Sequence, residues 1–197
     1  FIIMRWGCQT KNLAMLKFLL EKELESFNKH YQNASLERKE TILGIRNVSI
    51  GVALSRACEE GWIEGFNLLA SVPEFTFRPY HVDILLTSAL LGNNDEMIQR
   101  LLVWIEAKQI DIYAIRHDLN LEKMFNAVVK TGKVALLQKL QTFFAEKQLD
   151  VDSSMSSSGE GALLKVAINH GHLDMVRYLV ACQVPRQWAV GGMERPM

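Results

Sequence analysis

The chain has 197 residues, enough to bury one or two cores, and its 49% hydrophobic and 22% charged residues are typical of globular proteins. Twenty-two Lys and Arg balance 22 Asp and Glu, so the net charge of zero attracts neither a nucleic acid nor an anionic membrane. No stretch approaches the roughly 18 consecutive apolar residues of a membrane span. We therefore expect neither nucleic acid nor membrane as a partner.

The three cysteines, Cys8, Cys58 and Cys182, stand far apart in the sequence. An odd number without a Cys-x-x-Cys pair argues against a disulfide framework and predicts a reducing compartment, the cytoplasm. A chain that starts with Phe1 resembles a fragment of something longer, so targeting signals are expected outside it.

Five helical hairpins are predicted in chain order, near residues 1–20, 51–71, 82–105, 121–144 and 160–182. Each consists of two short amphipathic helices joined at one residue, which we call the anchor. The anchors are Lys11, Gly61, Asn93, Gly132 and Gly171. Gly and Asn tolerate the positive φ that ends a helix, whereas Lys is a misfit.

Residues at fixed distances from the anchor share one side-chain class. Seven residues before it stand Met4, Leu54, Leu86, Phe125 and Leu164. Four before it are the small or compact Gly7, Ala57, Ala89, Val128 and Ala167, and three before it Cys8, Cys58, Leu90, Val129 and Ile168. Five after it are Leu16, Phe66, Ile98, Leu137 and Val176, and eight after it Leu19, Leu69, Leu101, Leu140 and Leu179. These spacings mark a buried stripe on both helices, so the hairpins must stack to cover each other.

Longer segments separate these hairpins. The insertion 21–49 is expected to prolong the preceding helix and to add a short helix over Leu36–Leu43. Val72–His81, with two prolines, predicts an extended loop or finger, and Ile110–Asn120 predicts a second connector. Asp150–Glu160 is rich in serine. We predict one repeat domain over 1–184, followed by a tail or the start of another region at 185–197.

The fifth unit, Gly161–Val180, resembles the ankyrin repeat, whose consensus runs T-P-L-H-x-A-A-x-x-G-H-x-x-x-V-x-x-L-L. The matching residues are Leu164, Ala167, Gly171, His172, Leu173, Val176 and Leu179. The match is weaker in Gly51–Ala70 and Leu85–Leu102, and the other two units share only a helical outline. No unit keeps the Thr-Pro start, and the anchors are spaced by 50, 32, 39 and 39 residues, against about 33 in the family.

This resemblance implies an all-α, ankyrin-like helical-hairpin solenoid of about five degenerate repeats with long inter-repeat loops. Arrays of this kind resemble those in bacterial effectors and large signalling proteins. For a secreted effector, the reducing compartment would be the host cytosol.

Few residues suggest catalysis or metal binding. His170 and His172 flank an anchor, but no further ligand lies nearby in sequence, and His172 matches the structural histidine of the family. Cys58 lies on the apolar stripe, and Glu59-Glu60 ends a helix, where exposure is expected. No phosphate-binding, hydrolase or metalloprotease motif is present. We predict no catalytic residue, no metal and no cofactor.

A partner surface follows from the resemblance, because loops and first helices line the concave face of ankyrin stacks. The residues that stand six before each anchor form a polar row, which is expected to point outward: Arg5, Ser55, Thr87, Asn126 and Lys165. Two loops add the side-chain types of interface hot spots: Phe77, Arg78, Tyr80, Arg116 and His117. Alternatively, Phe75 or Phe77 folds under to cover its hairpin.

The leading functional interpretation is a protein–protein interaction module, monomeric by itself, that binds a protein partner and is not an enzyme. An alternative is a non-catalytic regulatory or substrate-presenting segment of a larger multidomain enzyme such as a bacterial effector. A third is a structural repeat of the HEAT or tetratricopeptide kind, which Pro73 and Pro79 argue against.

Overall fold

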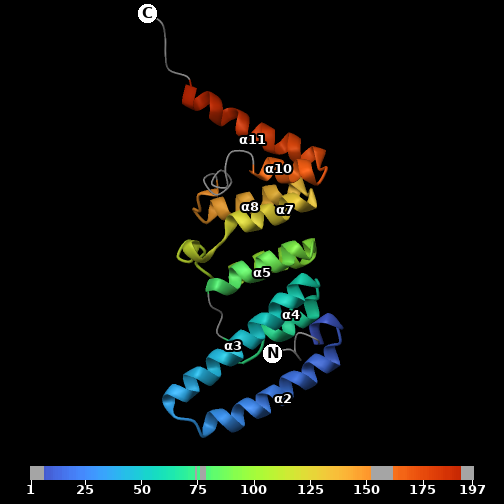
Figure 1. The fold of residues 1–197 in the computed structure, drawn as a ribbon. Coiled ribbons are helices and arrows are strands. Elements are labelled where there is room, and N and C mark those ends of the chain that lie inside the picture. The colour runs from blue at the N-terminus through green and yellow to red at the C-terminus, as the bar shows by residue number, and fades with distance from the viewer. Residues whose placement is uncertain (1–6, 74, 76–78, 152–161, 192–197) are drawn as a thin grey trace, which may run out of the picture. The chain divides into compact units, whose positions relative to one another are not determined.

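The computed structural model describes residues 7–73, 75, 79–151 and 162–191, with the backbone alone at Pro79, Tyr80, Asp118 and 183–191. Over these ranges the protein is all-α and contains no strand (Figure 1). The chain forms two compact units, Phe1–Asp111 and Ile112–Met197, and each is described by itself. In the same ranges, every helix is too short or too polar to cross a bilayer.

The first unit contains three hairpins. Residues 7–9 are helical and precede α2 (Leu13–Gln32). The second hairpin pairs α3 (Leu36–Glu59) with α4 (Ile63–Ala70), and the third pairs α5 (Pro79–Leu91) with α6 (Asp95–Ala107). Like helices contact each other in successive hairpins: α2 packs on α4, α3 packs on α5, and the rings of Phe66 and Trp104 join α4 to α6 edge to face at 5.7 Å.

The second unit contains two hairpins behind a short 3₁₀ helix, η1 (Arg116–Asp118). One hairpin pairs α7 (Leu121–Thr131) with α8 (Val134–Glu146), and the other pairs α10 (Ala162–Asn169) with α11 (Leu173–Gly191). As in the first unit, the first helices of the two hairpins, α7 and α10, contact each other, and so do the second helices, α8 and α11 (Figure 1).

The anchors fold as the sequence predicts. Gly61, Gly132 and Gly171 have φ of 63°, 73° and 71°, and Asn93 and the misfit Lys11 have 55° and 49°. The amide of Gly61 donates to the carbonyl of Cys58, and the next amide donates to Ala57 at 2.8 Å. Asn93 and Gly171 repeat this pair of hydrogen bonds, which is the Schellman motif that closes a helix.

The predicted stripes are largely buried. Leu69, Leu101, Leu140 and Leu179, eight residues after their anchors, are at most 2% exposed, whereas Leu19 is half-buried. The compact residues four before the anchors, Gly7, Ala57, Ala89, Val128 and Ala167, are all buried. Compact side chains there let the first helices of neighbouring hairpins approach closely. Two apolar positions break the pattern: Ile168 is 58% exposed and Met15, at a core position of its helix, is 37% exposed.

Three segments differ from the sequence prediction. The insertion 21–49 prolongs α2 to Gln32, as expected, but the helix that starts at Leu36 does not end at Leu43 and continues as α3 to Glu59. Pro79 begins α5 instead of lying in a loop, since the first turn of a helix needs no amide donor there. α11 continues past Pro185 to Gly191, where we expected a tail.

The parts of α2 and α3 that belong to the insertion 21–49, which we call the α2–α3 extension, are held together by a buried arginine. Arg46 of α3 is 3% exposed, and its Nε lies 3.3 Å from the carboxylate of Glu23 on α2. Its guanidinium stacks over the ring of Phe27 at 4.3 Å and donates to the carbonyl of Pro73 at 3.3 Å. One cation thus joins both long helices to the segment after α4.

Trp62 also differs from expectation. The turn after the second anchor suggested an exposed ring, but Trp62 is 6% exposed. It lies over Gly65, where an added β-carbon would be 2.5 Å from two ring atoms. The indole therefore covers the first turn of α4 and belongs to the core.

Candidate interaction surface

The polar row six residues before the anchors does not point outward throughout. Lys165 is exposed and Asn126 half-buried, but Thr87 is only 3% exposed, so the predicted orientation is wrong at that residue. The reason is the close packing of α3 on α5, which places Thr87 on the inner side of α5. Arg5 lies outside the described residues.

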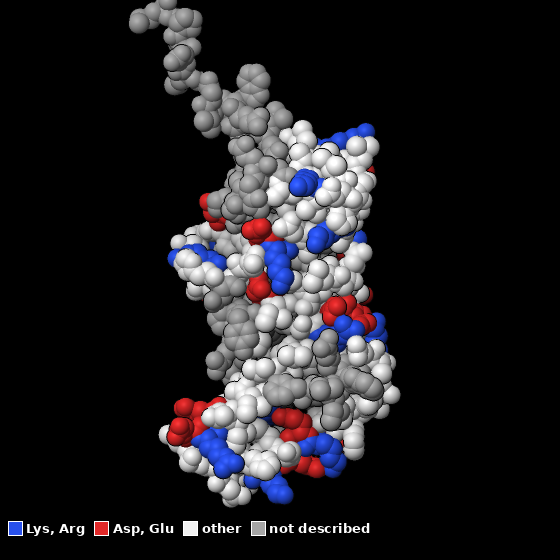
Figure 2. Space-filling model, viewed as in Figure 1, with Lys and Arg blue, Asp and Glu red and all other residues white. Residues whose placement is uncertain are grey.

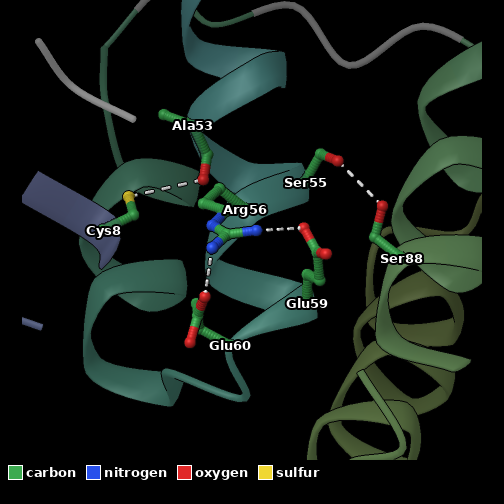
Figure 3. A network of polar contacts seen from close by, with 7 residues as sticks. All are labelled: Cys8, Ala53, Ser55, Arg56, Glu59, Glu60 and Ser88. Atoms are coloured by element: carbon green, nitrogen blue, oxygen red, sulfur yellow. Dashed lines mark hydrogen bonds and ion pairs between the residues drawn. The ribbon is translucent and has the colours of Figure 1, made fainter. Parts of the chain in front are cut away.

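Ser55 and Ser88 join the two first helices of unit 1. Their hydroxyl oxygens are 2.8 Å apart, and Figure 3 shows the side chains facing each other from neighbouring helices. Ser55 therefore links two hairpins. Because both residues are half-buried, this hydrogen bond lies at the rim of the α3–α5 contact and not inside the core.

Apolar side chains on both sides of that hydrogen bond are exposed. On α3, Ile45, Val48 and Val52 follow helical spacing toward Ser55, with exposed fractions of 52%, 47% and 39%. On α5, Ile84 and Leu91 lie one turn before and one turn after Ser88 and are 43% and 61% exposed. We call these exposed side chains of the two packed helices the α3–α5 face: Ile45, Val48, Val52, Ile84 and Leu91.

The corresponding positions of α7 in unit 2 carry charge instead. Val52 and Ile84 stand nine residues before their anchors, where α7 has the exposed Lys123. Leu91 stands two before its anchor, where α7 has the exposed Lys130. The face of α7 therefore differs in chemistry from the α3–α5 face.

The two loops proposed as contact residues are described in part. Phe77 and Arg78 lie outside the described residues, and Tyr80 is in α5 with its side chain undescribed. Phe75 is half-buried, its ring 5.3 Å from that of His81, which matches the alternative that this loop folds under. Arg116 and His117 are exposed on η1. Arg116 stacks over Tyr113 at 4.4 Å, so its guanidinium is held at the surface.

Comparison with known proteins adds no relative. No protein-family model, curated protein or solved structure matches this chain. Charge gives no guide to a polyanionic partner either, because basic and acidic side chains are interspersed on the face shown in Figure 2. The exposed apolar side chains of the α3–α5 face are therefore the feature of unit 1 that bears on a partner.

The acidic pair Glu59-Glu60 serves an ion-pair network. Arg56 binds Glu59 at 2.7 Å and Glu60 at 2.5 Å, and Figure 3 shows the guanidinium between the two carboxylates. Glu59 is exposed, as the sequence suggested, and Glu60 is partly covered. Both carboxylates are occupied at the end of α3, which favours a structural role over acid–base catalysis.

The two histidines of the last hairpin bond to backbone carbonyls. A ring nitrogen of His172 lies 2.8 Å from the carbonyl oxygen of Lys130, and one of His170 lies 3.0 Å from that of Val166. His172 therefore joins its hairpin to the preceding one, the structural role that the resemblance implied. In the stretches that the structure describes, no three His, Cys, Asp or Glu side chains are grouped to hold a metal.

Two of the three cysteines are core residues. Cys58 and Cys8 are both fully buried, and Cys8 donates its thiol hydrogen to the carbonyl of Ala53 at 3.4 Å. Burial raises the pKa of Cys8 to about 11, although nearby Arg56 opposes the rise. Burial, reinforced by Cys8, also raises the pKa of Cys58. Neither thiol is suited to nucleophilic catalysis, because the thiolate is the reactive form.

Thiol labelling tests this assignment. At pH 8 we expect Ellman's reagent to modify only the half-exposed Cys182 in the native protein, and all three cysteines in denaturant. Because folding raises the pKa of Cys8, its neutral thiol stabilises the fold fully below the unfolded value of about 8.5. That stabilisation is lost as the pH rises toward 11. Rapid native labelling of a Cys182→Ser variant would contradict the assignment.

Proposed function

We propose that the chain is a protein-interaction module of ankyrin-like stacked hairpins and that the α3–α5 face is its principal contact surface. Support comes first from the five anchors, which all adopt the left-handed conformation at the turn between paired helices. Like helices also pack on like in each unit.

The observation that carries the proposal is the exposure of Ile45, Val48, Val52, Ile84 and Leu91. Neighbouring apolar side chains on two packed helices are costly to leave in water and are typical of protein contact sites. An exposed apolar surface that extends over two helices fits a helix or a strand of a partner protein.

The test compares the proteins that wild type captures with those that two matched variants capture. Leu91→Glu places a charge on the contact surface, so burial of that leucine, worth about 1.5–3 kcal/mol, is lost. We expect the Kd of the partner to rise at least roughly tenfold. Val103→Glu is the control, because Val103 is equally exposed, at 60%, but lies on α6 outside the face.

The supporting result is a protein that wild type and Val103→Glu bind and Leu91→Glu does not, confirmed with the purified partner by calorimetry. Circular dichroism should show equal helix content in all three proteins. Equal binding by Leu91→Glu and an Ile84→Glu variant would refute this surface.

A further inference from the structure

The exposed side of α3 repeats with the spacing of a helix that packs on another helix. Side chains alternately three and four residues apart form one line, which we call the α3 seam: Arg38, Thr41, Ile45, Val48, Val52, Ser55 and Glu59. Ser55 is half-buried and the others are exposed. This spacing, 3.5 residues on average, is that of the contact positions of a coiled coil. The middle of the seam is apolar, where an exposed helix face ordinarily carries polar side chains.

The surface continues on α5, across its contact with α3. Close approaches pair the two helices in the same order along the chain: Gly51 with His81, Ser55 with Ser88, and Glu59 with Gly92. The helices are therefore parallel, and Val52 and Ile84 both lie one turn before the serine pair. Leu91 lies one turn beyond it. Because serine is small, a third helix can approach closely over the line where α3 and α5 meet.

The two ends of the α3 seam carry opposite charge. Arg38 is exposed at one end, and its two neighbours in sequence, one acidic and one basic, project about 100° to either side and offset each other. At the other end Glu59 and Glu60 share the guanidinium of Arg56, so a negative charge remains (Figure 3). At a rise of about 1.5 Å per residue, Arg38 and Glu59 are about 32 Å apart along α3.

A helix matches the spacing of this surface better than a strand does. Successive levels of the α3 seam are about 5 Å apart, as are those on the apolar side of an amphipathic helix. The side chains of such a helix therefore meet Ile45, Val48 and Val52 in turn. Side chains on one face of a strand are about 6.6 Å apart, so they lose this register within a few levels.

We propose that the α3–α5 face binds an amphipathic α-helix of the partner, about 20 residues long, with an acidic side chain beside Arg38 and a basic one beside Glu59. The inference rests on the proposed function and specifies the chemistry of its partner. Opposite charges at the two ends of the seam favour one direction of the bound helix, because the reverse direction brings like charges together.

Two synthetic peptides of about 20 residues and identical composition test the proposal. Leucines stand alternately three and four residues apart in the first peptide and two residues apart in the second. Both peptides carry glutamates at the amino end and lysines at the carboxyl end. Fluorescence anisotropy of the labelled peptides, titrated with the chain, gives each Kd. We expect the first peptide to bind at least roughly tenfold more tightly than the second and to gain helix content on binding.

Variants of the chain locate the bound peptide. Val52→Glu and Leu91→Glu each place a charge under the peptide, so the Kd of the first peptide should rise at least roughly tenfold. Val103→Glu, as exposed as Leu91 but on α6, should bind like wild type. Arg38→Glu should raise the Kd only about threefold, because exposed ion pairs are weak. A peptide with lysines at both ends should recover that loss.

The inference is overturned if the second peptide binds wild type as tightly as the first. It is also overturned if the first peptide does not bind wild type, or binds Leu91→Glu equally well. These outcomes are distinct from failure of the proposed function. If Leu91→Glu loses the captured protein while the second peptide binds wild type more tightly, the surface stands and its occupant is extended. If Leu91→Glu still captures that protein, the proposed surface itself is wrong.

Discussion

Gly92→Ala should strongly destabilise the first unit, although it adds only one methyl group. The added β-carbon would overlap the carbonyl oxygen of Glu59 and lie 2.7 Å from its carbonyl carbon. Because these are backbone atoms, a side-chain rotation cannot relieve the overlap, and α5 must move away from α3. We expect a loss of about 3 kcal/mol, seen as a melting temperature lower by roughly 10 °C.

Gly44→Ala is the matched control for that change. Gly44 lies inside α3, and no described atom comes within 4 Å of an added β-carbon. Alanine should therefore stabilise the helix by about 0.5–1 kcal/mol. If both substitutions shifted the melting temperature in the same direction, the close packing of α5 on the end of α3 would be refuted.

The second large effect is expected at Arg46. Replacement by alanine leaves the Glu23 carboxylate and the Pro73 carbonyl without their cation and opens space beside Phe27. Removal of one partner from a covered ion pair costs about 3 kcal/mol. The α2–α3 extension should then lose protection from hydrogen exchange, while amides of α7 and α8 keep theirs.

Arg46→Met distinguishes charge from packing. Methionine fills a similar volume without hydrogen bonds, so it should recover part of the packing over Phe27 but none of the ion pair. Arg46 and Phe27 line a hollow of about 390 Å³, and the methionine side chain can occupy part of it. If Arg46→Ala melted like wild type, the assigned role of the cation would be wrong.

The hairpin turns could be predicted from the sequence because their requirements are local. A glycine or asparagine must follow one apolar stripe and precede another, and this pattern located even Lys11 correctly despite its unfavourable residue type. The all-α class followed from the same periodicity. Packing partners of each helix could not be predicted, because identical stripes permit several rotations about the helix axis. Thr87 was placed on the wrong side for this reason.

The extended helices α2 and α3 were harder to predict. A short helix was expected to end at Leu43, yet α3 continues through Gly44 to Glu59, because Arg46 and Phe27 hold the two helices together. Contacts between residues distant in sequence override local propensity here.

A second repeated feature, a corner after the second helix of a hairpin, is much harder to see in the sequence. Lys108-Gln109-Ile110-Asp111-Ile112 ends α6, and Lys147-Gln148-Leu149-Asp150-Val151 ends α8. Both glutamines have positive φ, 52° and 60°, and both corners bury the final branched residue. Glutamine is an uncommon residue for that conformation, so its presence does not predict a turn.

The candidate site was less predictable than the fold. The exposed face on α3 and α5 is made of Ile, Val and Leu side chains, which sequence patterns assign to the core. Only the packed arrangement shows that these side chains remain in contact with water. A polar row was therefore a poor guide to a surface whose chemistry is apolar.

The left-handed residues carry one last implication for how this protein can change. Lys11, Asn93, Gln109 and Gln148 hold a conformation that glycine adopts more easily, at a cost on the order of 1 kcal/mol for a residue with a β-carbon. Glycine at each of these four helix ends should therefore raise the melting temperature, and none of the four residues belongs to the α3–α5 face. Because the four residues lie in separate turns, their effects should add in any combination.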